Sequence, residues 1–143
     1  MRTDTDAPLR VLTFREHTRD CALIRKPSNE SLKQRLSRLA ASSQFTSTIT
    51  VGELSYGAHK VGRLDLLARV RQIVDSVVVL AFDSASAEIY GPLRARLEKK
   101  GLKLDEADLR IASIAIAHEC TLVTGNVRHF ARIDELKVED WLR

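Results

Sequence analysis

Two kinds of apolar pattern alternate along the chain. In the first kind, short runs rich in Val, Ile, Leu and Phe are bounded by polar or turn residues, which is typical of β-strands. The expected strands are Val11–Phe14, Phe45–Ile49, Val77–Phe82, Thr121–Thr124 and Lys137–Trp141. The run Val77–Phe82 shows no alternation of polar and apolar residues, so we expect that strand to be buried on both faces.

In the second kind, apolar residues recur at every third or fourth position, which predicts amphipathic helices. The expected helices are Asn29–Ala41, a segment beginning at Thr50, a segment marked by Leu64, Leu67, Val70 and Ile73, Asp83–Lys100, and Glu106 to about Glu119. The stretch Ile111–Ala117 is apolar almost all round, so its helix should be enclosed by other elements. Because strands alternate with helices, we expect an α/β fold whose mostly parallel sheet of four to five strands is flanked by helices.

Polar residues indicate where two of these helices begin. Thr50-Val-Gly-Glu53 fits a capping box, in which a hydroxyl and a glutamate satisfy each other's backbone N–H groups. Asp105 can cap the helix that follows it. Asn126–Phe130 should be a turn or a short helix.

The composition is that of one globular domain. Hydrophobic residues make up 44% and charged residues 29% of the 143 residues, and no linker or repeat divides the chain. We therefore expect a single domain over residues 1–143, with residues 1–8 as a frayed extension. No apolar run is long enough to span a membrane and no cleavable signal is recognisable, so a cytoplasmic protein is expected. Cys21 and Cys120 lack metal-binding spacing, which favours ordinary thiols.

Three corners of the expected sheet carry polar residues that could form a site. Glu53 lies at the start of a helix, Asp108 lies in the first turn of the apolar helix, and Asn126 follows the strand Thr121–Thr124. Ligands collect where the strands of a parallel sheet end. Carboxylates that converge there suit Mg²⁺ or Mn²⁺, and such an ion activates water against a phosphodiester. The net charge of +4 gives mild support for a polyanionic partner.

Each of these residues also has a purely structural interpretation. Glu53 could serve only the capping box, Asp108 could complement the helix dipole, and Asn126 could be a turn residue. The histidines show no metal-binding spacing. We expect His118 to be solvated or to cap its helix end, and His129 to be a surface residue. His17 and His59 have no other possible metal ligand at a suitable spacing in the sequence.

Several segments match, in order, the signatures of one known family. Ile49–Lys60 has a glutamate followed by a Gly-Ala pair, Asp108–Ala117 is an aspartate heading an apolar helix, and Thr121–Phe130 is a strand followed by Thr-Gly-Asn. From about Ile24 to Leu142, the chain resembles the PIN-domain ribonucleases, and among them the VapC toxins of bacterial toxin–antitoxin pairs.

The resemblance implies a PIN fold, an endoribonuclease that depends on Mg²⁺ or Mn²⁺, and inhibition by a VapB-like antitoxin. It makes Glu53 and Asp108 acidic metal ligands, and it places Asn126 where the family has Asp or Asn. His129 falls where many members have an acid, so that ligand is absent or replaced.

The first family signature, a strand ending in Asp-Thr-Asn, is altered in this chain. An ungapped count places Glu16 at the aspartate position. One deletion instead places His17 there, with Thr18 keeping the threonine, and Asp20 is a third candidate. Glu16 is therefore our first choice for the third metal ligand.

Two functional hypotheses follow. In the first, the protein is an active ribonuclease in which Glu53, Asp108 and Glu16 hold the metal and Asn126 is a further catalytic residue. The basic residues expected to contact the RNA backbone are Arg110, Arg128 and Arg132. In the second, a catalytically weakened PIN domain binds an antitoxin or RNA without cutting. A nucleotide-binding α/β protein is disfavoured, because no glycine-rich phosphate loop follows any strand.

One helix also suggests a mode of assembly. Its apolar stripe and the basic residues around it resemble the region that related toxins use to bind an antitoxin tail and to self-associate. These residues are Leu64, Leu67, Val70 and Ile73, with Lys60, Arg63, Arg69 and Arg71. The same stripe could instead pack on the protein's own sheet. We predict a homodimer with two-fold symmetry.

Overall fold

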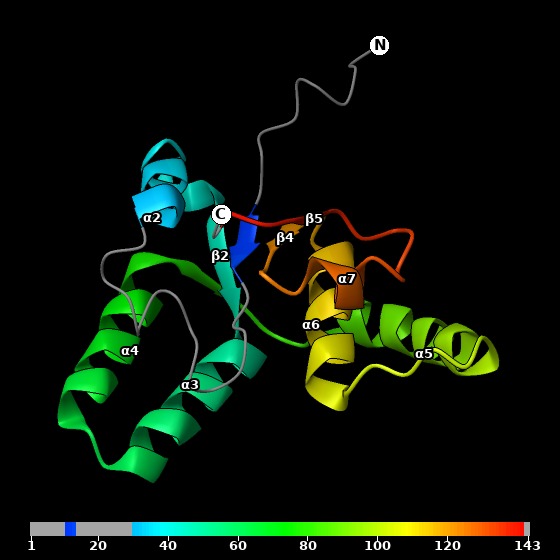
Figure 1. The fold of residues 1–143 in the computed structure, drawn as a ribbon, viewed down its shortest axis with the longest axis horizontal. Helices are drawn as coiled ribbons and strands as arrows, with labels where there is room; N and C mark the ends of the chain where they lie inside the picture. Colours follow the sequence, from blue (N-terminus) through cyan, green and yellow to red (C-terminus); the bar gives the residue numbers. More distant parts are fainter. Residues whose placement is uncertain (1–10, 14–29, 142–143) are drawn as a thin grey trace.

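The fold is built on a five-stranded parallel sheet with the strand order β3-β2-β1-β4-β5 (Figure 1). The structure is a computed structural model that describes residues 11–13 and 30–141. The strands are β1 (Val11–Thr13), β2 (Gln44–Ser47), β3 (Val78–Leu80), β4 (Thr121–Val123) and β5 (Val138–Glu139). The α/β fold and the parallel sheet expected from the sequence are confirmed.

The strand order places β1 at the centre of the sheet. From β1 the chain moves outward through β2 to β3 at one edge, then crosses to the other side of β1 to form β4 and β5. The direction of winding thus reverses between β1 and β4. Such a switch point leaves a crevice outside the carboxyl ends of the strands, where open α/β sheets bind ligands.

The helices surround this sheet. They are α2 (Glu30–Ser37), α3 (Thr48–Val61), α4 (Leu64–Ser76), α5 (Ser84–Lys99), α6 (Glu106–Ala117) and α7 (Val127–Phe130), with a short 3₁₀ turn, η2 (Ala41–Ser43). Figure 1 places the α3–α4 pair to the left and the α5–α6 pair to the right, with strands between them. We call the α3–α4 pair the helical hairpin. Its link turns sharply at Gly62, whose φ of 66° favours glycine. Within the described part of the chain, no helix combines the length and the apolar character needed to cross a membrane.

Helix α6 lies at the centre of the larger hydrophobic cluster, which we call the main core. Its residues Ile111–Ala115 are all buried, and Ile111 and Ile114 have 0% of their surface exposed. They are joined there by Leu122 of β4 and by Phe130 of α7. The prediction that this helix is enclosed by other elements is confirmed.

The helical hairpin has a much smaller core of its own. Leu54 of α3 and Val70 of α4 are buried together, and Val74 packs against them. Around them, Leu64 and Val61 are exposed by 80% and 59%. Among the described side chains, the apolar cluster within the hairpin is therefore small.

The predicted start of α3 is wrong. The helix begins at Thr48, and Ser47 is its N-cap: the Ser47 hydroxyl accepts a hydrogen bond from the Thr50 backbone N–H at 3.0 Å. Ser47, and not Thr50, is the N-cap because it is fully buried at the end of β2. Its hydroxyl also contacts that of Thr50 at 2.9 Å. Glu53 consequently lies in the second turn of α3, and it is not the acid of a capping box.

The expectation that Val77–Phe82 is buried on both faces is also wrong. Only Val78–Leu80 forms a strand, and that strand, β3, lies at the edge of the sheet. Val78 is 44% exposed as a result. The other expected strands and helices are present, most with ends displaced by a few residues.

Candidate functional site

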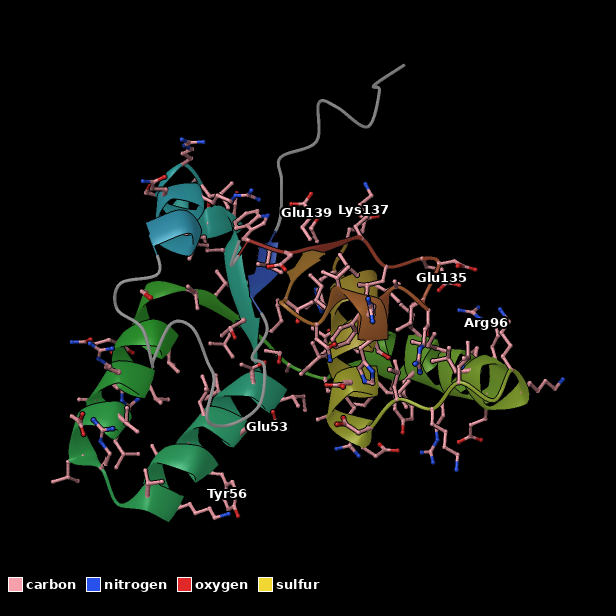
Figure 2. The ribbon with its side chains drawn as sticks, in the orientation of Figure 1. Glu53, Tyr56, Arg96, Glu135, Lys137 and Glu139 are labelled. Atoms are coloured by element: carbon pink, nitrogen blue, oxygen red, sulfur yellow. The ribbon has the colours of Figure 1, made fainter. Side chains whose placement is uncertain are left out.

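The candidate site lies at the carboxyl ends of the central strands. Helix α3 follows directly from the end of β2, and α7 follows shortly after β4. Since α6 leads back to the start of β4, the first turn of α6 lies at this same edge. Helices α3 and α6 are in contact, and Figure 2 shows Glu53 on α3 between the two. The fold thus brings the Glu53 segment and the Asp108 segment to the same edge of the sheet, where open α/β sheets bind ligands.

Glu53 occupies the α3 side of this crevice. Glu53 is partly buried, and its Oε2 atom is shielded from solvent. Leu54 and Ala58, on a neighbouring face of α3, are buried and hold the helix against the rest of the protein. One turn further along, Tyr56 is 61% exposed (Figure 2). The carboxylate therefore lies where α3 passes from buried to solvent-exposed surface.

Asp108 is the acid on the α6 side, and its side chain is only 12% exposed. The Asp105 side chain caps α6 by accepting a hydrogen bond from the Asp108 backbone N–H at 2.9 Å. The next residue, Leu109, is buried in the main core. The cap and the core contact fix the backbone on both sides of Asp108, so the direction of its carboxylate is well defined.

His129 contacts the Asp108 carboxylate: its Nε2 lies 2.8 Å from Oδ2 of Asp108. The expectation that His129 is a surface residue is therefore wrong, and its side chain is only 28% exposed. The fully buried Phe130 anchors the single turn of α7, and the two rings meet edge to face at 5.7 Å. The sequence signal for this contact was the position of His129, directly before the Phe, where many members of the resembled family carry an acid.

Asn126 lies at the start of α7. Its backbone N–H donates to the hydroxyl of the buried Thr124 at 3.0 Å, which forms a tight turn after β4. The residue is exposed, and its side chain makes no capping hydrogen bond to α7. The turn interpretation is thus confirmed for its backbone.

The expected third ligand, Glu16, and its alternatives His17 and Asp20 lie outside the described residues. Over residues 11–13 and 30–141, no group of three or more His, Cys, Asp or Glu side chains is arranged to hold a metal ion. The segment that contains these residues follows β1, the central strand, whose carboxyl end opens onto the crevice.

The three expected RNA-binding arginines differ in their surroundings. Arg110 pairs with Glu106 at 3.3 Å and lies 6.0 Å from the ring centre of Phe82. Arg132 donates to the backbone oxygen of Lys103 at 3.5 Å. Arg128, on α7 beside His129, is exposed. Arg110 is thus two residues from Asp108 on α6, and Arg128 directly precedes His129, which contacts Asp108, whereas Arg132 lies beyond α7.

Other acids near the helix ends have structural roles. Asp83 caps α5 by accepting hydrogen bonds from the hydroxyl and the backbone N–H of Ser86, at 2.7 and 2.9 Å, and its Oδ2 lies 3.2 Å from Nε2 of His118. These contacts, those of Ser86 most of all, lower the pKa of Asp83. His118 is the C-cap of α6, as expected.

Comparison with known proteins identifies the family. The family model described as "PIN domain" matches residues 21–136. The chain belongs to the PIN-domain family. A relative from Salmonella typhimurium, named "tRNA(fMet)-specific endonuclease VapC", is 34% identical over 132 residues, which cover 92% of this chain and 99% of the relative. A "Ribonuclease VapC2" from Rickettsia felis is 39% identical over 102 residues, 66% of this PIN domain and 72% of the relative.

Solved structures agree with this assignment. The PIN domain superposes with a TM-score of 0.82 and 32% identity on a chain of the DNA-bound VapBC complex from Salmonella typhimurium, over 93% of this chain and 98% of that one. For a chain of VapBC2 from Rickettsia felis, bound to a promoter DNA fragment, the TM-score is 0.77 and the identity 30%, over 93% and 99% of the two chains. The resemblance to VapC-type PIN domains stated from the sequence is confirmed.

Proposed function

We propose that this PIN domain is a VapC-type endoribonuclease that depends on Mg²⁺ or Mn²⁺. The observation that carries the proposal is the contact between α3, which bears Glu53, and α6, whose first turn bears the buried Asp108, at the edge of the sheet where the direction of winding reverses. The names of the relatives, ribonuclease and endonuclease, support the reaction class.

The donor set fits a hard divalent cation. Glu53 and Asp108 offer carboxylate oxygens, which are the ligands that Mg²⁺ and Mn²⁺ prefer. Glu16 is our candidate for the third acid, because it follows β1 in the sequence, and β1 ends at the same edge of the sheet as β2 and β4. When bound, the ion would activate a water molecule and neutralise charge that develops on the phosphate.

The protein's own residues would orient the reacting groups. Asp105 and His129 hold Asp108 from its backbone and from its carboxylate. Asn126, exposed at the start of α7, would donate hydrogen bonds to the substrate. Arg110, Arg128 and Arg132 would bind backbone phosphates in a sequence-independent way.

We further propose a VapB-like antitoxin as partner, since the similar solved structures are toxin–antitoxin complexes. The hairpin supplies an apolar surface for a partner helix or for a second copy of the chain, because Leu64 and Val61 are largely exposed. The homodimer predicted from the sequence is consistent with this exposure. RNA cleavage under antitoxin control implies action in the cytoplasm, as a single PIN domain over residues 1–143.

The experiment that tests the proposal is RNA cleavage by Asp108→Asn. The substitution keeps the size of the side chain but removes the charge, so Mg²⁺- or Mn²⁺-dependent cleavage should fall by about a hundredfold or more. Asp134→Asn is the matched control, because Asp134 is exposed in the loop between α7 and β5. Fluorescence of Trp141, the sole tryptophan, monitors folding of both variants.

Two outcomes would change the assignment. Cleavage that Asp108→Asn leaves undiminished would overturn the proposed site. A wild-type protein that binds RNA or antitoxin but cuts nothing in either metal, and that gains cleavage when Glu16 or His17 is changed to Asp, would favour the catalytically weakened PIN domain.

A further inference from the structure

We propose that His129 is a nitrogen ligand of the divalent metal, beside Asp108, and that it makes this site prefer Mn²⁺ to Mg²⁺. The inference rests on the metal dependence proposed above. It goes further by assigning a specificity-determining role to one histidine.

The first argument is the spacing of the two donor atoms. Nε2 of His129 and Oδ2 of Asp108 are 2.8 Å apart. Two ligand atoms on neighbouring corners of an octahedron, with metal–ligand bonds of about 2.1 Å, lie about 3 Å apart. The two side chains are thus already placed at nearly the separation that a shared ion needs.

The second argument is that both donors are held in place. Asp108 is fixed by the Asp105 cap and by its position at the head of the buried α6. His129 is fixed by the neighbouring Phe130, which has no exposed surface. Its imidazole nevertheless keeps 28% of its surface open, so an ion entering the crevice can reach it.

The third argument is the chemistry of imidazole. Mg²⁺ takes oxygen ligands almost exclusively, whereas the later first-row divalent metals bind imidazole increasingly well. An acid at this position would leave the site with oxygen donors alone. With His129 in that place, the donor set is mixed, and it should favour Mn²⁺.

The simpler alternative is that His129 only forms an ion pair or hydrogen bond with Asp108. In that case, His129 would orient the carboxylate but would not touch the metal. Pulsed electron paramagnetic resonance of bound Mn²⁺ separates the two roles, because a coordinated imidazole nitrogen modulates the electron spin echo and an imidazole outside the coordination sphere does not.

The experiment uses the purified full chain loaded with Mn²⁺ and the variants His129→Asp and His129→Ala. We expect nitrogen modulation in the wild type and its loss in both variants. Mn²⁺ affinity, measured from the free-ion signal, should fall at least about tenfold in His129→Ala. In His129→Asp, the ratio of Mn²⁺ to Mg²⁺ affinity, measured by competition, should shift toward Mg²⁺ by a similar factor.

The other three histidines provide the controls. His59 contacts the Ser55 carbonyl and His118 contacts Asp83, both away from the candidate acids, and His17 lies outside the described residues. The variants His17→Gln, His59→Gln and His118→Gln should all keep the nitrogen modulation. Modulation that persists in His129→Asp, or that disappears in His17→Gln instead, would overturn the inference.

These outcomes are separate from the test of the proposed function. If the protein binds Mn²⁺ through His129 but cuts no RNA, this inference stands and the proposed nuclease function is wrong. If the protein cuts RNA with Mg²⁺ and Mn²⁺ equally well and shows no nitrogen modulation, the proposed nuclease function stands and this inference is wrong.

Discussion

The two sides of the candidate site are built very differently. Asp108 and His129 lie directly before Leu109 and Phe130, two residues of the main core, where α6 has several residues with no exposed surface. Glu53 belongs to the helical hairpin, whose own core is Leu54 and Val70, with Val74 against them. One acid thus heads a helix anchored in the main core, while the other lies in an element with a small described core and exposed apolar side chains. The same hairpin therefore has to place Glu53 and presents exposed apolar side chains to solvent.

The largest expected effect comes from a substitution in the main core. Ile114→Ala would leave a cavity in a site that has no exposed surface, and should lower the free energy of unfolding by about 4 kcal/mol. Urea denaturation followed by Trp141 fluorescence measures the loss. If Ile114→Ala lost less unfolding free energy than the hairpin variant Leu54→Ala, the main core would not be the more tightly packed of the two.

The matching substitution in the hairpin is Leu54→Ala. Because the described cluster around Leu54 is small, we expect the hairpin to relax around the deletion, with a loss of about 2 kcal/mol. The same denaturation experiment gives the value. Hydrogen exchange should show the extra opening confined to α3 and α4, and an opening spread equally over α6 would contradict separate cores.

A smaller effect is expected from the cap that positions Asp108. Asp105→Ala removes the acceptor for the Asp108 backbone N–H, and should cost about 1 kcal/mol of unfolding free energy. Asp105→Asn is the control, because asparagine caps almost as well as aspartate. Both stabilities can be read from the same urea titration, and equal losses in the two variants would show that the cap is not the cause.

Asp83, the N-cap of α5, should contribute to the free energy of unfolding in a way that depends on acid pH. Its pKa is lowered in the folded state, chiefly by Ser86, so it contributes stability above the ordinary pKa and loses that contribution as the pH falls through the folded-state value. Asp83→Asn should therefore show a smaller difference in unfolding free energy between pH 6 and pH 3 than the wild type. An unchanged difference would mean that Asp83 does not contribute to acid sensitivity.

The smallest effect on stability is expected at the exposed end of the hairpin. Leu64 is 80% exposed, so Leu64→Ser should change the free energy of unfolding by no more than about 0.5 kcal/mol. If the hairpin forms the dimer contact, the same variant should sediment as a monomer of 16.0 kDa. Val78→Ser, at an exposed position on the sheet edge, should leave the dimer intact. A dimer that survives in Leu64→Ser would place the contact elsewhere.

The elements that were predictable from the sequence are those whose pattern depends on burial alone. Helix α6 was expected to be enclosed because Ile111–Ala117 is apolar almost all round, and it is. The edge position of β3 was missed because a run of valines looks the same at the centre and at the edge of a sheet. Strand order, which decides between the two, is set by tertiary packing.

The site was predictable only in part, for a similar reason. Asp108 and the Asp105 cap follow from local sequence, and the cap is present. The start of α3 was predicted too late because both Ser47 and Thr50 can serve as a helix N-cap. Only burial at the end of β2 selects Ser47. The contact between His129 and Asp108 joins α7 to α6, so helical periodicity and capping patterns do not reveal it, and only the position of His129 in the family signature pointed to the site.

The two ends of the sheet restrict how this protein can associate with other chains. The edge strands β3 and β5 are three and two residues long. An open edge invites strand-to-strand pairing between molecules, but edges this short offer few unpaired backbone groups to a foreign strand. The exposed Val78 therefore creates little risk of fibril growth. Contacts with other chains are left to the helices, where side-chain shape and charge can discriminate between partners.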